Sequence, residues 1–158
     1  MSAPATLDHA AIAARIPHQG TMCLLAAVDA WDAQRIRCRA TSHRAADNPL
    51  RDGDGLPATS AIEYAAQAMA VHGALVAAPA ATPRMGYLAS VRAVELHVTR
   101  LDTIPEALEI DAERLSGDEH NILYAFTVSA GGACLARGRA AVILDAGRLA
   151  GPLPGSRP

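Results

Sequence analysis

The fold is decided by the stretch SAIEYAAQAMAVHGALVAA, which covers residues 60–78. Apolar side chains occupy almost every position in it, and Pro79 and Pro83 follow at its end. This pattern predicts one long helix over about residues 60–78, stopped by the prolines. A helix that is apolar on nearly all sides must be covered by protein on nearly all sides.

Alternating segments flank this helix and predict the sheet that covers it. Before the helix, residues 24–31 are expected to form one strand, and residues 35–40 (RIRCRA) alternate strictly between arginine and apolar side chains. After the helix, strands are predicted within residues 85–99 and over 108–113, 122–129 and 134–144. Successive hairpins of this kind predict an α+β fold, in which an antiparallel sheet of five to six strands curls around one long central helix.

The rest of the chain adds a short predicted helix over residues 7–16, which Pro17 stops. We expect residues 1–145 to form a single domain, since 158 residues is the size of one ordinary domain. The segment 146–158 is rich in proline and glycine and is expected to be a disordered tail.

Composition excludes several classes of function. All fourteen basic residues are arginine, which removes Schiff-base chemistry and the lysine-dependent phosphate loop. A net charge of −2 and an aromatic content of 3% give no indication of a nucleic-acid partner. The three cysteines are an odd, widely spaced set that predicts neither disulfides nor a zinc site, so we expect buried thiols, a cytoplasmic protein and no metal or cofactor. Polar residues interrupt the longest apolar run, so no membrane span is predicted.

Three polar residues interrupt the predicted helix. Glu63 and Gln67 are four residues apart and share a face, whereas His72 lies on the opposite side. Ser60 and Glu63 have the spacing of a capping box, which gives Glu63 a purely structural interpretation. The alternative is that the carboxyl group, beside the free amides of a helix N-terminus, binds and polarises a carbonyl or thioester oxygen. Gln67 makes either a local hydrogen bond or a contact with substrate.

Two motifs resemble the beta-hydroxyacyl-acyl-carrier-protein dehydratases of fatty-acid synthesis. IPHQGTM (residues 16–22), with the strand after it, resembles the opening of that family, and PATSAIEYAAQ (57–67) resembles the start of its central helix. More closely, NPLRDG (48–53) leading into IEYAAQ (62–67) is similar to a divergent branch, whose members are predicted dehydratases found with aryl-polyene and xanthomonadin-type pigment pathways. The resemblance covers about residues 10–145.

The resemblance implies a fold, a reaction and part of a site. The family fold is the hotdog, a curved antiparallel sheet around one helix, and it is usually dimeric. The implied reaction is loss of water from a 3-hydroxyacyl thioester that an acyl-carrier protein carries on its phosphopantetheine arm. The family's acidic residue corresponds to Glu63, and its oxygen-binding backbone amide to about Ala58. The family's catalytic histidine has no counterpart, because the loop RDGDGLP (51–57) contains none.

Another group must therefore supply the base, and histidine is the natural base near neutral pH. His18 is the best candidate among six histidines, because it lies in the Pro-His motif; ordering of its loop is the alternative. His72 is expected to be a packed core histidine, and Asp52 and Asp54 belong to a sequence typical of a turn. The hypothesis is that His18 and Glu63 act as a base and acid pair in a cleft at a dimer interface.

Two other functions stay open, and so does the identity of the partners. Without the usual histidine, the chain could be a degenerate hotdog subunit that binds acyl-carrier protein or pairs with an active dehydratase; it could also be an acyl thioesterase. We expect a homodimer or a heterodimer with another hotdog protein. The acidic carrier protein would bind basic residues, with Arg84 and Arg92 as candidates, whereas the stripe Arg35, Arg37 and Arg39 reads as ordinary sheet surface.

Overall fold

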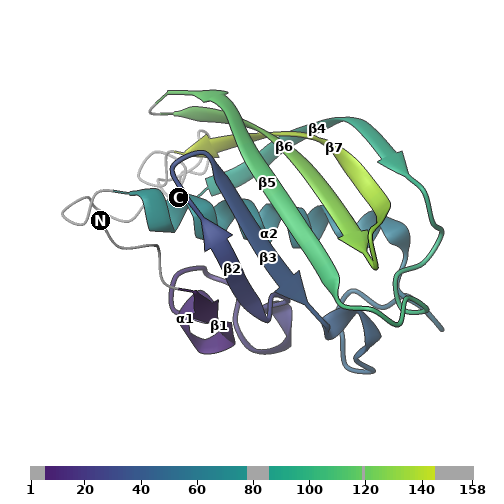
Figure 1. Cartoon of the computed structure of the whole chain (residues 1–158). Helices are drawn as coiled ribbons and strands as arrows, with labels where there is room; N and C mark the ends of the chain where they lie inside the picture. Colours follow the sequence, from purple (N-terminus) through teal and green to yellow (C-terminus); the bar gives the residue numbers. More distant parts are fainter. Residues whose placement is uncertain (1–5, 78–85, 119, 145–158) are drawn as a thin grey trace, which may run out of the picture.

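A single long helix lies against the concave side of a curved antiparallel sheet. The computed structural model describes residues 6–77, 86–118 and 120–144; the predicted tail and Arg84 lie outside them. Helix α2 spans Ala61–Val76, and the sheet curves across it from one side to the other (Figure 1). The α+β hotdog architecture predicted from the sequence is thereby confirmed.

The sheet has seven strands in the described residues, in the order β1-β2-β3-β5-β6-β7-β4, and every neighbouring pair is antiparallel. The strands before α2 are β1 (Leu7–Asp8), β2 (Ala27–Trp31) and β3 (Arg35–Ala40). Those after it are β4 (Gly86–Leu96), β5 (Leu108–Gly117), β6 (Asn121–Ala130) and β7 (Ala133–Leu144). Because β5 pairs with β3, the strands before and after α2 form one continuous sheet around the helix.

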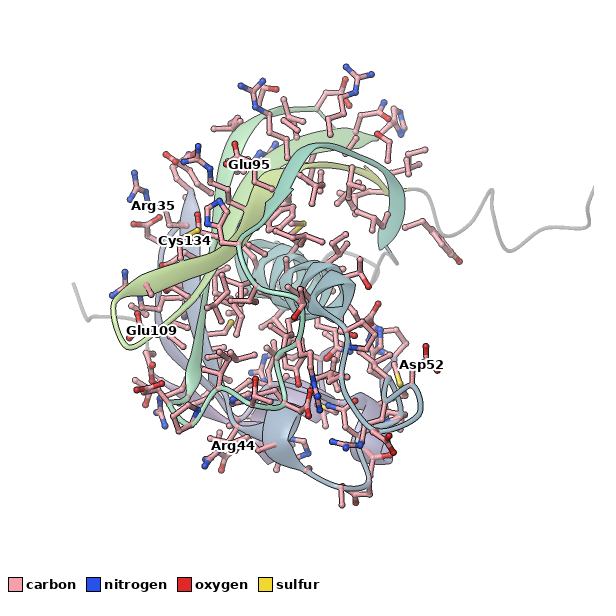
Figure 2. All side chains as sticks on the ribbon, turned by 90° about the vertical axis from the view of Figure 1, so that its right-hand side faces the viewer. Arg35, Arg44, Asp52, Glu95, Glu109 and Cys134 are labelled. Carbon is pink, nitrogen blue, oxygen red and sulfur yellow. The ribbon has the colours of Figure 1, made fainter. Side chains whose placement is uncertain are left out.

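The core lies between the sheet and the helix. Alternate residues of β6 are buried, including Tyr124 and Phe126, as a half-buried strand requires. From the helix, Tyr64, Ala68 and Val71 are fully buried. Figure 2 looks along α2 and shows the ribbon of the sheet curving around it, with Arg35 and Glu95 on the outside.

The N-terminal region differs most from the prediction. The expected helix over residues 7–16 is reduced to α1 (His9–Ala13), because Leu7 and Asp8 instead form β1 against β2. Asp8 then caps the short helix by accepting a hydrogen bond from the Ala11 amide. This two-residue strand raises the sheet to seven strands, so the prediction of five to six was too low.

Two boundaries also move inward. The central helix begins at Ala61 and ends at Val76, slightly inside the predicted range. Strand β2 begins at Ala27 instead of residue 24, because the Leu24 amide donates to a side chain of the helix and takes no part in the sheet ladder. None of the helices in the described part of the chain is long and apolar enough to cross a membrane.

Candidate active site

His18 and Glu63 meet beside the first turn of helix α2. His18 lies between α1 and the 3₁₀ helix Gly20–Met22, and Glu63 lies at the start of α2. The Nε2 atom of His18 is 3.2 Å from Oε2 of Glu63, which is an ion-pair distance. The two side chains are 27% and 33% exposed, so a small molecule could reach both. The pair proposed from the sequence is thus brought together by the fold.

Gln67 connects this pair to the segment that carries His18. Its Oε1 accepts a hydrogen bond from the Leu24 amide at 2.9 Å, and its Nε2 donates to the Met22 carbonyl at 2.8 Å and to Oε2 of Glu63 at 3.0 Å. Gln67 is completely buried. Its amide is therefore bonded to the protein itself, as in the local-hydrogen-bond interpretation, and contact of Gln67 with substrate stays a prediction.

The segment around His18 is held by a short series of local hydrogen bonds. The amides of Met22 and Cys23 donate to the carbonyls of Gln19 and Gly20. The Gln19 side chain donates to the Ala13 carbonyl, which ties the segment to the end of α1. Gly20 has a φ of 60°, a left-handed conformation that glycine adopts without steric cost. The histidine is therefore presented by an ordered turn.

The capping box predicted at the start of α2 does not form. Ser60 has helical dihedral angles, makes no side-chain capping bond and follows a 3₁₀ turn over Ala58–Ser60. Glu63 instead turns toward His18 and Gln67. A carboxylate in the first turn of a helix is still favoured by the positive end of the helix dipole.

The Ala58 amide is not free to bind a substrate oxygen. It donates a hydrogen bond to the Thr99 carbonyl at 3.0 Å, and Ala58 is only 3% exposed. The connection is part of a bridge between Pro57 and Arg100, which fixes the chain entering α2 to the segment after β4. A role of the Ala58 amide in binding substrate stays a prediction, and it would require this bond to Thr99 to open.

The Nδ1 atom of His18 is a buried polar atom of the site. Among the described residues it has no hydrogen-bond partner, although Nε2 of the same ring faces Glu63. Most buried ring nitrogens of histidine are paired, so an unpaired one marks a place where structure alone does not account for the residue.

The surroundings of the other candidates for the base do not suit that role. His72 is fully buried, with hydrogen bonds to the Tyr124 hydroxyl and the Asp32 carbonyl, and it is the packed core histidine that the sequence predicted. Burial lowers the pKa of His72, which keeps it uncharged. Asp52 and Asp54 are exposed in a turn closed between Asp52 and Gly55 (Figure 2, where Asp52 is labelled).

The arrangement suits proton transfer. A carboxylate and an imidazole lie side by side, half-exposed, on a rigid helix and an ordered turn, as general acid–base catalysis requires. Within the described ranges, no group of three or more histidine, cysteine or acidic residues is placed to hold a metal ion.

The family comparison agrees with this chemistry. Residues 10–148 match the model of the ApeP-like family, which is described as ApeP dehydratase. The chain belongs to the ApeP-like dehydratase family. A search of curated protein sequences found no match.

Solved structures place this ApeP-like protein among hotdog proteins. A chain of the dehydratase heterocomplex ApeI:P from Xenorhabdus doucetiae is 27% identical, with a TM-score of 0.74 over 87% of this chain and 92% of that chain. A thioesterase of Pseudomonas aeruginosa is 11% identical, with a TM-score of 0.56 over 74% and 78% of the two chains. A thioesterase of Haemophilus influenzae is 7% identical, with a TM-score of 0.56 over 75% and 77%. At such identities the two thioesterases share the fold alone.

Sequence reasoning missed the parts of the site that come from the backbone. The Leu24 amide and the Met22 carbonyl hold Gln67, and through it Glu63. The available signal was a glutamine on an otherwise apolar helix face, since a buried amide needs partners from another segment.

Proposed function

We propose that this ApeP-like protein removes water from a 3-hydroxyacyl thioester on the phosphopantetheine arm of an acyl-carrier protein and forms the 2-enoyl thioester, in fatty-acid-like or aryl-polyene synthesis. The observation that carries the proposal is the half-exposed pair of His18 and Glu63, 3.2 Å apart, in a chain of a dehydratase family. Elimination requires one proton to leave C2 and another to reach the departing hydroxyl group. These two residues would carry both transfers.

A second subunit is part of the proposal, because strand β4 is an exposed apolar edge of the sheet that the structure describes. β4 lies at one end of the strand order, and its side chains are mostly exposed. Leu96 pairs with the buried Ala136, and Leu88 with Val142, which packs on the core, so both leucines face the core side. They are nevertheless 40% and 42% exposed. A long, apolar and exposed edge strand is typical of a surface that pairs with another chain.

The partner that fits this edge is another hotdog subunit. A matching β4 edge, or the edge of a related chain, would extend the sheet and cover both leucines. One solved relative is a chain of the heterocomplex named ApeI:P, which favours a heterodimer over a homodimer. In that arrangement the chain would act with its partner on the carrier-bound substrate, or would serve as a non-catalytic subunit.

The test uses a carrier protein loaded with a 3-hydroxyacyl thioester. The substrate is incubated with this protein alone, and with this protein together with a hotdog dehydratase subunit that has been shown to bind it. Intact-mass measurement of the carrier protein then reads the product directly. Loss of one water from the acyl group is the expected result.

Other products would exclude the proposal. Release of the whole acyl group as a free acid would make the protein a thioesterase. Unchanged substrate with this protein alone and with its partner would contradict dehydration. A loss of water that persists in the mixture when Glu63 is replaced by glutamine here, but stops when the partner is inactivated, would assign the non-catalytic role to this chain.

A further inference from the structure

The segment that leads from His18 to the sheet is held by side chains. Both backbone groups of Leu24 bond to such side chains: its amide donates to Oε1 of Gln67 at 2.9 Å, and its carbonyl accepts from Oγ of Ser42 at 2.8 Å. Leu24 precedes the sheet ladder, since β2 begins at Ala27. The two side chains therefore fix this segment and, with it, the place of the nearby His18.

The hydroxyl groups behind Leu24 have a defined direction of donation. A serine hydroxyl has one hydrogen and a carbonyl oxygen only accepts, so the hydrogen of Ser42 points to Leu24. The Tyr64 hydroxyl, 2.7 Å from Oγ of Ser42, must then be the donor in that contact. Tyr64 is fully buried, and burial raises the pKa of its phenol, which keeps its hydrogen in place at neutral pH.

Asn48 completes this series of hydrogen bonds. Its Nδ2 donates to the Tyr64 hydroxyl at 3.2 Å and to the Ser42 carbonyl at 2.8 Å, so both hydrogens of the amide are used. Its Oδ1 accepts from the Leu50 amide at 2.8 Å, and the residue is only 5% exposed. A buried polar network in which each member is satisfied holds its groups rigidly.

The series ends on the helix turn that carries the catalytic candidate Glu63. Tyr64 is the next residue of α2, and Gln67 lies one turn further along. Gln67 holds the Leu24 amide directly, while Tyr64 reaches the Leu24 carbonyl through Ser42. Two separate connections therefore tie the first turns of the helix to the segment of the histidine.

We propose that Ser42, Tyr64 and Asn48 are positioning residues for the dehydration; this inference rests on the proposed function. Through the segment before β2 they keep His18 at its place beside Glu63. A displacement of about 1 Å in a reacting group can cost about 100-fold in rate, so the loss of one hydroxyl in this series should lower turnover. The proposal also gives a role to Asn48, the first residue of the NPLRDG motif.

Two tyrosines of the core provide a matched test. Tyr64→Phe and Tyr124→Phe each remove one hydroxyl from a buried ring, the first from Ser42 and the second from His72. Both should lower the midpoint of urea unfolding by similar amounts. With the carrier-bound substrate, Tyr64→Phe should lower kcat by about tenfold and leave KM within about twofold, whereas Tyr124→Phe should keep the wild-type kcat.

A conservative pair at Ser42 provides the second test. Ser42→Ala removes the donor to the Leu24 carbonyl and should lower kcat per folded molecule by about tenfold, while Ser42→Thr keeps a hydroxyl and should restore most of it. A purely structural role would move the urea midpoint of Ser42→Ala and leave its kcat unchanged. That result, or an equal loss of kcat in Tyr64→Phe and Tyr124→Phe, would overturn the proposal.

The imidazole Cε1–H signals in ¹H–¹³C spectra provide a readout that does not depend on activity. The His18 signal, identified by its absence in His18→Gln, should shift in Tyr64→Phe and Ser42→Ala. Tyr124→Phe should leave it in place and shift the signal of His72 instead. A His18 signal that stays in place in the first two variants would overturn the proposal. If the shifts occur but the wild-type protein and its partner remove no water, the proposed function alone is contradicted, and the hold of these residues on His18 stands.

Discussion

Two histidines lie near the two ends of helix α2, and they differ in burial and in hydrogen bonding. His72, on the helix, is completely buried; its Nδ1 bonds the Tyr124 hydroxyl and its Nε2 the Asp32 carbonyl, both at 2.8 Å. His18, docked near the helix start, is partly exposed, has one nitrogen near Glu63 and leaves the other unpaired. Complete burial with every polar atom satisfied indicates a structural role, whereas partial exposure with incomplete pairing leaves a group available for chemistry.

Replacing Glu63 should give the largest loss of activity, and it tests the partly exposed site that contains His18. Glu63→Gln keeps the size of the side chain and an oxygen that can accept from Gln67, but it removes the proton-transfer group. We expect dehydration of the carrier-bound substrate to fall by about 10² to 10⁴. The midpoint of urea unfolding should change little, because the side chain is 33% exposed. Unchanged turnover would mean that Glu63, like His72, has only a structural role.

Replacing His72 should show the reverse pattern. His72→Leu fills a similar volume but leaves the buried Tyr124 hydroxyl without its partner, whereas the carbonyl of the exposed residue Asp32 can bind water instead. A stranded buried group costs about 1–3 kcal/mol, so the free energy of unfolding should fall by about that amount. Urea unfolding measures the loss, and turnover per folded molecule should equal that of the wild type. A specific loss of turnover would mean that the buried histidine takes part in the reaction.

Much of this contrast could be predicted from the sequence. Apolar runs and strict alternation located α2, β3, β5, β6 and β7, because periodicity reflects burial directly. The resemblance selected Glu63, and residue type together with position selected His18. Local spacing allowed a capping box with Ser60 as one interpretation of Glu63, and this box does not form because the Glu63 side chain turns toward the docked His18 segment. Contacts of this kind join residues far apart in the chain, and no local pattern encodes them.

Gln67 combines features of a structural and a catalytic residue, since it is buried like His72 but bonds to Glu63. Gln67→Leu would leave the Leu24 amide and the Met22 carbonyl unpaired and would release the Glu63 carboxylate. We expect the free energy of unfolding to fall by about 1–3 kcal/mol and turnover to fall as well. Parallel urea unfolding and product assays measure the two effects. A loss of stability with full turnover would show that Glu63 needs no positioning by Gln67.

The buried histidine should also make the fold sensitive to acid. Burial lowers the pKa of His72 below its ordinary value of 6.5, despite the hydrogen bond to the Asp32 carbonyl, and burial lowers that of His43 too. The unfolded chain therefore binds more protons than the folded one as pH falls below about 6.5, and stability is lost in that range. The slope is at most about 1.4 kcal/mol per pH unit for each histidine.

Urea unfolding at pH 7.5, 6.5 and 5.5 measures this slope. His72→Leu should remove its own share of the dependence and leave that of His43. A wild-type stability that is flat over this range would mean that the two histidines are protonated as easily in the folded protein as in the unfolded chain. That result would weaken the distinction drawn between the buried and the exposed histidine.

Replacing surface arginines should change stability least. Two of them, on the outer face of the sheet, again differ in whether they have a partner. Arg37 on β3 bonds Asp111 on β5 at 2.9 Å, while Arg92 on β4 stands directly opposite Arg139 on β7. Arg37→Gln should lower the free energy of unfolding by less than about 1 kcal/mol, and added salt should reduce the difference, because exposed ion pairs contribute little. Its affinity for an acidic carrier protein, measured by titration calorimetry, should not change, because Asp111 already neutralises this arginine. Arg92→Gln, the matched variant without a carboxylate opposite, should bind the carrier more weakly; equal affinities in the two variants would remove Arg92 from the docking surface.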